Sequence, residues 1–207
     1  SDMVLVDNLR DYLKTIDGFN SVSINYRNEN FGLASSIIQG VTEVLKSNDR
    51  AIILEDDLVT SKYFLNFMND ALEKYESRED VGSVHGYWYP INDDLPDTFF
   101  IRGASCWGWG VWSSSWNNFE ADGSVLLKKL LEKNLKNHFN LDNSMDYIKM
   151  LKSQISGKND SWAIRWHASN FIKNKLQLHS SKSLVNNIGF DGTGTHCDNT
   201  EEFLTLL

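Results

Sequence analysis

Cysteine is scarce in this chain of 207 residues, which contains only Cys106 and Cys197. Two cysteines are too few for a disulfide framework, and they lie too far apart for a zinc motif, so we expect reduced thiols. Basic residues are also in deficit, because 20 Lys and Arg face 28 Asp and Glu and leave a net charge of -8. This balance argues against nucleic acid or an anionic membrane as the main partner.

Long apolar runs are missing as well. None reaches the roughly 18 consecutive residues that a membrane-spanning helix needs, and no secretory leader is recognisable at the start. A hydrophobic content of 41% and a charged content of 23% are typical of a globular protein. We therefore expect a cytoplasmic protein with one domain over residues 1–207, because no linker, repeat or low-complexity tract interrupts it.

An apolar run that ends in consecutive acids is the most distinctive stretch. Residues 51–54 are apolar, and Glu55, Asp56 and Asp57 follow at once. A run of this length without alternation is typical of a strand buried on both faces. Adjacent carboxylates are costly in a dry interior, but beyond the end of a strand they suit a divalent cation bound to a diphosphate. The alternative is a solvated acidic turn that caps the next helix.

Hydrophobic periodicity predicts how the rest of the chain is organised. Helices are expected over 4–16, 37–45, 63–75, 125–136, 143–155 and 160–174, and short strands over 22–26, 51–54, 81–84 and 99–102. The chain thus opens as helix, strand, helix, strand, which predicts a parallel βαβ unit. A crossover helix needs a strand before it, so we expect that the chain begins late and lacks a leading strand.

Tryptophan is abundant, with seven in the chain and four of them within residues 107–116. Aromatic rings offer flat apolar faces to sugars and exclude water, so this cluster could wall a binding site. Tryptophan is also usually well buried, and we expect about half of the cluster to pack inward.

The order of these features resembles the metal-dependent glycosyltransferases of the GT-A type. The triplet that ends in Asp57 resembles the Glu-Asp-Asp variant of their D-x-D motif, as in N-acetylglucosaminyltransferase I and its bacterial relatives. The loop Asn30-Phe31-Gly32-Leu33 resembles their Asn-x-Gly-Leu loop near the nucleotide, and Trp107-Gly108-Trp109-Gly110 resembles their acceptor-side segment. The resemblance implies an α/β fold of the GT-A, Rossmann-like kind (nucleotide-diphospho-sugar transferase), with a mixed sheet flanked by helices.

The resemblance also implies roles for the acids. Asp57 corresponds to the acid that contacts Mn²⁺ or Mg²⁺ directly, Glu55 to the one that contacts ribose or metal-bound water, and Asp56 to one that faces a donor hydroxyl. Asn30, Gly32 and Leu33 would lie near the nucleotide, and Trp107, Gly108 and Trp109 near the acceptor.

Two later residues complete the expected site. Asp160 is the best match to the family's catalytic base, although Ser161 interrupts the usual Trp-Asp-Asp-Trp pattern, and His196 resembles a late histidine that adds a second protein ligand to the metal. The alternatives are that Asp160 only caps its helix, since aspartate is a preferred N-cap, and that His196 only closes its loop through hydrogen bonds.

The implied activity is transfer of a hexosyl or N-acetylhexosaminyl group from a nucleotide donor, with a UDP-sugar expected, to a glycan acceptor. Inversion is expected, because no covalent nucleophile is recognisable. The implied setting is bacterial surface polysaccharide synthesis at the cytoplasmic face of the membrane. The missing first strand, which holds the nucleobase in this family, is expected to weaken donor binding.

Two other classes remain open. A metal-dependent nucleotidyltransferase or phosphatase also places carboxylates at strand ends, although neither a second acid cluster nor a lysine-rich phosphate loop is evident. A non-catalytic glycan-binding module would use the tryptophans and a structural cation such as Ca²⁺.

Overall fold

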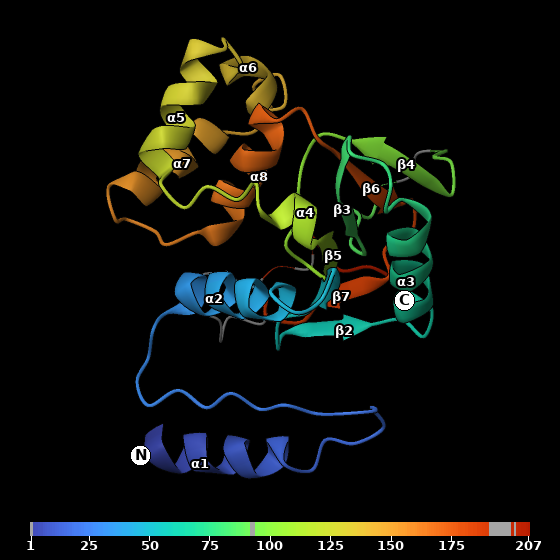
Figure 1. Ribbon diagram of the computed structural model, residues 1–207. Coiled ribbons are helices and arrows are strands. Elements are labelled where there is room, and N and C mark those ends of the chain that lie inside the picture. Colours follow the sequence, from blue (N-terminus) through green and yellow to red (C-terminus); the bar gives the residue numbers. More distant parts are fainter. Residues whose placement is uncertain (1, 92–93, 191–199, 201) are drawn as a thin grey trace. The chain divides into compact units, whose positions relative to one another are not determined.

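The computed structural model describes residues 2–91, 94–190, 200 and 202–207. The chain divides into two units, Ser1–Gly32 and Leu33–Leu207 (Figure 1). No helix within these described ranges is long and apolar enough to cross a membrane.

The smaller unit contains the expected first helix, α1 (Asp2–Leu13), but not the strand predicted at 22–26. The segment that follows α1 is tied back to it, because Arg10 donates to the Arg27 carbonyl at 3.0 Å and Tyr26 donates to the Arg10 carbonyl at 3.3 Å. A strand needs a neighbouring strand to pair its backbone groups. The described residues of this unit contain no strand that could pair with residues 22–26. The alternating pattern alone was therefore not sufficient to form a strand.

The larger unit is a mixed α/β structure. Its elements in chain order are α2 (Leu33–Leu45), β1 (Arg50–Ile53), β2 (Leu58–Thr60), α3 (Phe64–Lys74), β3 (Val81–His85), β4 (Thr98–Ile101), β5 (Trp109–Trp112), α4 (Ser113–Trp116), α5 (Gly123–Glu132), α6 (Lys136–Phe139), α7 (Tyr147–Ile155), α8 (Trp162–Ile172), β6 (Leu176–Ser180) and β7 (Val185–Asn187). All but the first of the helices predicted from periodicity lie here, within a few residues of their expected bounds.

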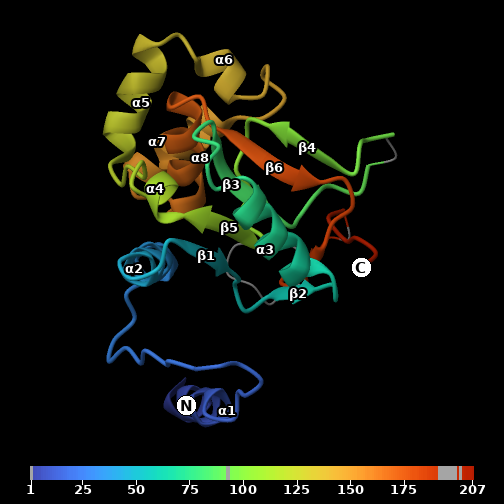
Figure 2. The same cartoon turned by 45° about the vertical axis from the view of Figure 1, so that its right-hand side comes forward.

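Five strands form a sheet in the order β1-β5-β3-β6-β4, and β2 and β7 form a separate two-stranded ribbon (Figure 2). Within the described part of the chain, β3 and β6 are the one parallel pair, and the other pairs are antiparallel. The prediction of a mixed sheet flanked by helices is confirmed. The predicted opening βαβ unit is wrong, because β5 is the one neighbour of β1 among the described strands and is antiparallel to it.

The strand before the acids is therefore not the strand buried on both faces that we expected. Of the four residues of β1, Arg50 is exposed and the next three are half-buried. The strand lies at one end of the sheet, with α2 packed against it. An unalternating apolar run can also belong to an edge strand if a helix covers it, and this explains the error.

Strand β5 lies between β1 and β3 and is antiparallel to both, and the family resemblance had assigned its first residues to an acceptor segment. All four residues of β5 are buried, and their side chains alternate between two cores. Trp109 and Val111 face the core built with α2 and α8, while Trp112 faces the core under α3. A Cβ at Gly110 would lie 3.0 Å from a Leu72 methyl group, so a glycine here lets α3 approach the sheet closely.

The helices α5, α7 and α8 pack around a third core of eight buried side chains, with α6 beside them. Figure 1 shows these helices gathered at one side of the larger unit, next to the sheet. Helix α8 belongs to two cores. Its Trp162 and Trp166 contact Trp109 of β5. On the other side, Ile164, Ala168 and Phe171 face α5 and α7. Helix α8 therefore joins the helical part of the unit to the sheet.

Candidate functional site

The acids lie in the turn between β1 and the β2–β7 ribbon. The Leu58 backbone N–H donates to the Glu55 carbonyl at 3.3 Å, which closes this turn. Leu58 then pairs with Asn187 of β7, and the Ile188 N–H donates to the Asp57 carbonyl at 2.8 Å. The chain around Asp57 is thus fixed against a segment about 130 residues further on.

The Asp57 carboxylate is held on one oxygen and free on the other. Its Oδ2 accepts a hydrogen bond of 3.1 Å from the side-chain amide of Asn187. Its Oδ1 is buried and has no hydrogen-bond partner among the described residues. A buried carboxylate oxygen without a partner costs free energy, and in proteins such charges are paired or bind a metal.

The other two acids differ from Asp57 in exposure. Asp56 is exposed and Glu55 is half-buried. Burial, together with the nearby charges of Asp57 and Asp56, raises the pKa of Glu55 to about 7. A positive charge at this turn would relieve the repulsion among the three carboxylates.

The residues of this turn fit a divalent cation of the Mg²⁺ or Mn²⁺ kind. Within the described ranges, no group of three or more His, Cys, Asp or Glu side chains is gathered as a metal site. These cations are usually bound by one or two carboxylates together with substrate phosphates and waters, so a closed protein cage is not required. The free Asp57 Oδ1 is the ligand that this turn offers.

A cavity of about 360 Å³ opens beside this region. Its lining residues are contributed by the segments after β3 and β4, by the helices α7 and α8, by β6 and by the C-terminal segment, and seven are aromatic: Tyr87, Trp88, Tyr89, Trp107, Tyr147, Phe190 and Phe203. Arg102 is the one Asp, Glu, Lys or Arg among the described lining residues. The cavity has the size and the aromatic lining of a small-molecule pocket.

The predicted acceptor residues are separated by the structure. Trp107 lines the cavity, and its ring packs edge-on against Tyr87 with centroids 4.5 Å apart. Gly108 is buried with φ of 65°, and a Cβ there would lie 2.7 Å from a Val185 methyl group, so this glycine is required by the backbone. Trp109 is fully buried in the core and lines no part of the cavity, so its placement does not support contact with an acceptor.

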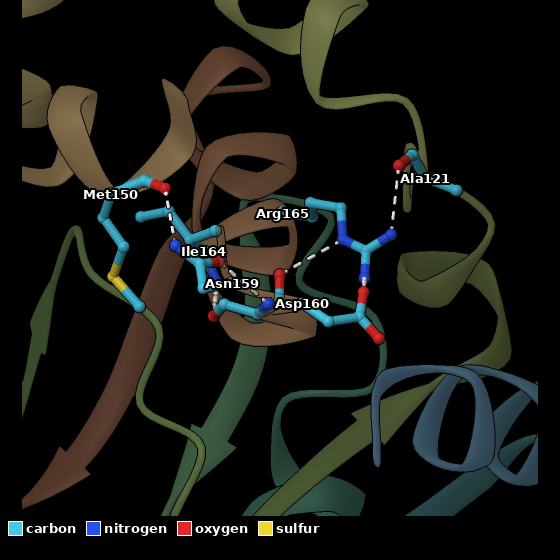
Figure 3. Close-up of polar contacts among 7 residues, drawn as sticks. Ala121, Met150, Asn159, Asp160, Ile164 and Arg165 are labelled. Atoms are coloured by element: carbon cyan, nitrogen blue, oxygen red, sulfur yellow. Dashed lines mark hydrogen bonds and ion pairs between the residues drawn. The ribbon is translucent and has the colours of Figure 1, made fainter. Parts of the chain in front are cut away.

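The predicted base, Asp160, lies on the segment just before α8. Ser161 is the N-cap of α8, because its Oγ accepts a hydrogen bond from the Ile164 N–H at 3.2 Å. The N-cap role that was the alternative for Asp160 therefore belongs to Ser161. The Asp160 carboxylate is mostly exposed and accepts from Arg165 at 3.3 Å. Figure 3 shows the Arg165 guanidinium between this carboxylate and the Ala121 carbonyl, which also accepts at 3.3 Å.

Neither Asp57 nor Asp160 lines the cavity, but a residue connected to each of them does. Gly189, whose neighbour Phe190 lines the cavity, lies against the Asp57 carboxylate. Asp160 precedes by three residues Ala163, which lines the cavity from the first turn of α8. Each predicted catalytic position is therefore connected to the cavity lining through a short stretch of chain.

The remaining predicted residues are Asn30 and Gly32 of the smaller unit, Leu33 and His196. Asn30 Oδ1 accepts from the Gly32 N–H at 2.8 Å, a local turn within the smaller unit. Leu33 is the exposed first residue of α2. His196 lies outside the described residues.

Sequence reasoning missed Asn187 and the two histidines that line the cavity, His167 and His179. An asparagine in a short strand carries no spacing signal that points to Asp57. The histidines lie in apolar surroundings, where a single histidine is more often packed than functional.

Three histidines are buried in the neutral form, and this predicts loss of stability in acid. Burial lowers the pKa of His167 and His179 to about 4 and the pKa of His85 well below its ordinary value. The unfolded chain binds more protons between about pH 6.5 and 4, so the free energy of unfolding should fall as the pH drops through that window. His167 and His179 should each lower the free energy of unfolding at pH 4 by on the order of 2 to 3 kcal/mol.

Urea unfolding of His167→Gln between pH 7.5 and 4 measures this contribution. The variant should lose stability less steeply with falling pH than the parent protein, whatever its stability at neutral pH. The matched control is His138→Gln, because the His138 side chain is 67% exposed. If His167→Gln and the parent show the same slope, burial of neutral His167 does not cause the acid sensitivity.

A comparison of the chain with models of protein families and with curated proteins finds no match. The fold and the site alone thus describe this protein as a mixed α/β protein with an acidic turn and an aromatic cavity.

Proposed function

We propose that this protein is a metal-dependent glycosyltransferase of the GT-A type that transfers a sugar from a nucleotide diphosphate donor to a glycan acceptor. The observation that carries the proposal is the Asp57 carboxylate, which is fixed through Oδ2 and unpartnered at Oδ1 where the chain leaves β1. The ordered motifs of the sequence and the adjoining aromatic cavity support it.

In this proposal, Asp57 and the aromatic residues of the cavity have separate roles. Asp57 would hold the cation through Oδ1, and when bound this ion would neutralise charge on the leaving diphosphate. The aromatic wall around Trp107 would stack against the acceptor sugar and exclude water that would otherwise hydrolyse the donor.

Asp160 would act as the general base. The acceptor hydroxyl would give its proton to the Asp160 carboxylate as its oxygen forms a bond to the anomeric carbon. The bond from that carbon to the diphosphate breaks at the same time, and its electron pair leaves with the nucleoside diphosphate. In-line attack of this kind inverts the anomeric centre.

Titration calorimetry with Mn²⁺ and a panel of UDP-, GDP- and dTDP-sugars tests the proposal. We expect one nucleotide class to bind, and to bind only when the cation is present. Release of a nucleoside diphosphate on addition of glycans would follow, whereas release of pyrophosphate would instead identify a nucleotidyltransferase. A folded protein that binds none of these donors would rule the proposal out.

A further inference from the structure

The Asp57 carboxylate is positioned by two residues that lie far from it in the sequence, Asn187 and Gly189. Asn187, at the end of β7, donates its side-chain amide to Asp57 Oδ2 at 3.1 Å. The other end of the same amide group, Oδ1, accepts from the Gly189 N–H at 2.7 Å. Asn187 is only 5% exposed, so both bonds are shielded from competing water.

Gly189 packs closely against the Asp57 carboxylate. A Cβ at position 189 would lie 2.7 Å from Asp57 Oδ2 and 3.2 Å from Asp57 Cβ. Any larger residue would therefore push the carboxylate away from its present position. The glycine leaves the space that the Asp57 side chain occupies, and its N–H fixes the orientation of the Asn187 amide.

Asn187 and Gly189 both lie against Oδ2 of Asp57 and leave Oδ1 without a partner in the described structure. The Asn187 amide occupies Oδ2, and Oδ1 is left buried without a partner in the described structure. A neutral amide donor cannot compensate the full charge of an ionised carboxylate, so the free oxygen keeps its affinity for a cation. A donor on both oxygens would have satisfied the group and removed this affinity.

We propose that Asn187 and Gly189 are positioning residues that orient Asp57 so that its Oδ1 is presented to a divalent cation. The proposal rests on the proposed function, because it assigns these residues to the cation that Asp57 would hold. Residues that orient a metal ligand in this way typically change metal affinity by about 10- to 100-fold when they are removed.

The decisive measurement is the affinity for Mn²⁺ in the presence of UDP, read from the electron paramagnetic resonance signal of the free ion. Asn187→Ala should weaken Mn²⁺ binding by about 10- to 100-fold. Gly189→Ala should weaken it as well, because it displaces the carboxylate without removing the hydrogen bond donor. This binding measurement does not require catalytic turnover, so it can be made for both variants even if they are inactive.

Asn186→Ala is the matched control. Asn186 is the neighbouring residue of β7, and its side chain donates to the Thr205 carbonyl at 2.8 Å and accepts from the Thr205 N–H at 2.8 Å. The Asn186 side chain is therefore also fixed by hydrogen bonds at both its nitrogen and its oxygen, but none of them involves Asp57. Its loss should lower the melting temperature and leave Mn²⁺ affinity unchanged.

For the glycine variant the control is Gly40→Ala on α2, where an added Cβ meets no atom within 4 Å. Equal Mn²⁺ affinity in Asn187→Ala and the parent, or an equal loss in Asn186→Ala, would overturn the positioning role while leaving the proposed function intact. A parent protein that binds no Mn²⁺ with any nucleotide would overturn both.

Discussion

Replacement of Asp57 by Asn should reduce sugar transfer by about a thousandfold or more. The change keeps the size of the side chain but removes the negative charge that would hold the cation. Neutralising a leaving diphosphate through a metal contributes several kcal/mol, and each 1.36 kcal/mol corresponds to about a tenfold change in rate. The measurement is the release of nucleoside diphosphate at saturating donor and Mn²⁺.

The same substitution should not weaken the fold of the metal-free protein. Oδ1 of Asp57 is buried and unpartnered, so in the absence of a cation its charge is a cost to the folded state. The melting temperature of metal-free Asp57→Asn should therefore equal or exceed that of the parent. A marked loss of stability would show that the carboxylate supports the fold, and it would remove the reason to assign it to a cation.

Asp70→Asn is a suitable control for both measurements. Asp70 is an exposed residue of α3, so its replacement makes the same change in net charge on the surface. Transfer activity and melting temperature should both stay close to those of the parent. If activity falls equally in both variants, the effect of Asp57→Asn reflects net charge and not a specific ligand.

The longer helices of the larger unit were predictable because each has an apolar stripe that packs into one of the cores. The strands were less so, and β5 shows why. Its sequence, Trp-Gly-Val-Trp, has bulky residues on both faces because it lies between α3 on one side and α2 and α8 on the other. A strand buried on both faces has no alternation of polar and apolar residues to detect.

The same limit applies to the site. Three acids after an apolar run mark the turn, but the sequence does not indicate which carboxylate is held and which is free. That depends on Asn187, which meets Asp57 only when β7 pairs with β2. Likewise, the assignment of an N-cap to Asp160 or to Ser161 differs by one residue, and backbone geometry decides it.

Asp160→Asn should lower transfer by about 10²- to 10⁴-fold, the usual contribution of a general base. The structural roles near Asp160 are carried by other groups, which makes the test specific. Ser161 caps α8, and Arg165 keeps bonds of 3.1 Å to the Ser161 carbonyl and 3.3 Å to the Ala121 carbonyl whether or not Asp160 is charged. The fold should therefore survive the substitution, as a melting curve would verify.

Ser161→Ala should give the opposite pair of results. Loss of the cap should reduce stability by about 1 kcal/mol, while transfer per folded molecule stays within a few-fold of the parent because the Asp160 carboxylate remains. Two adjacent residues would then separate activity from stability. If Asp160→Asn keeps its activity or loses stability as Ser161→Ala does, the carboxylate belongs to the helix end and another group must take the proton.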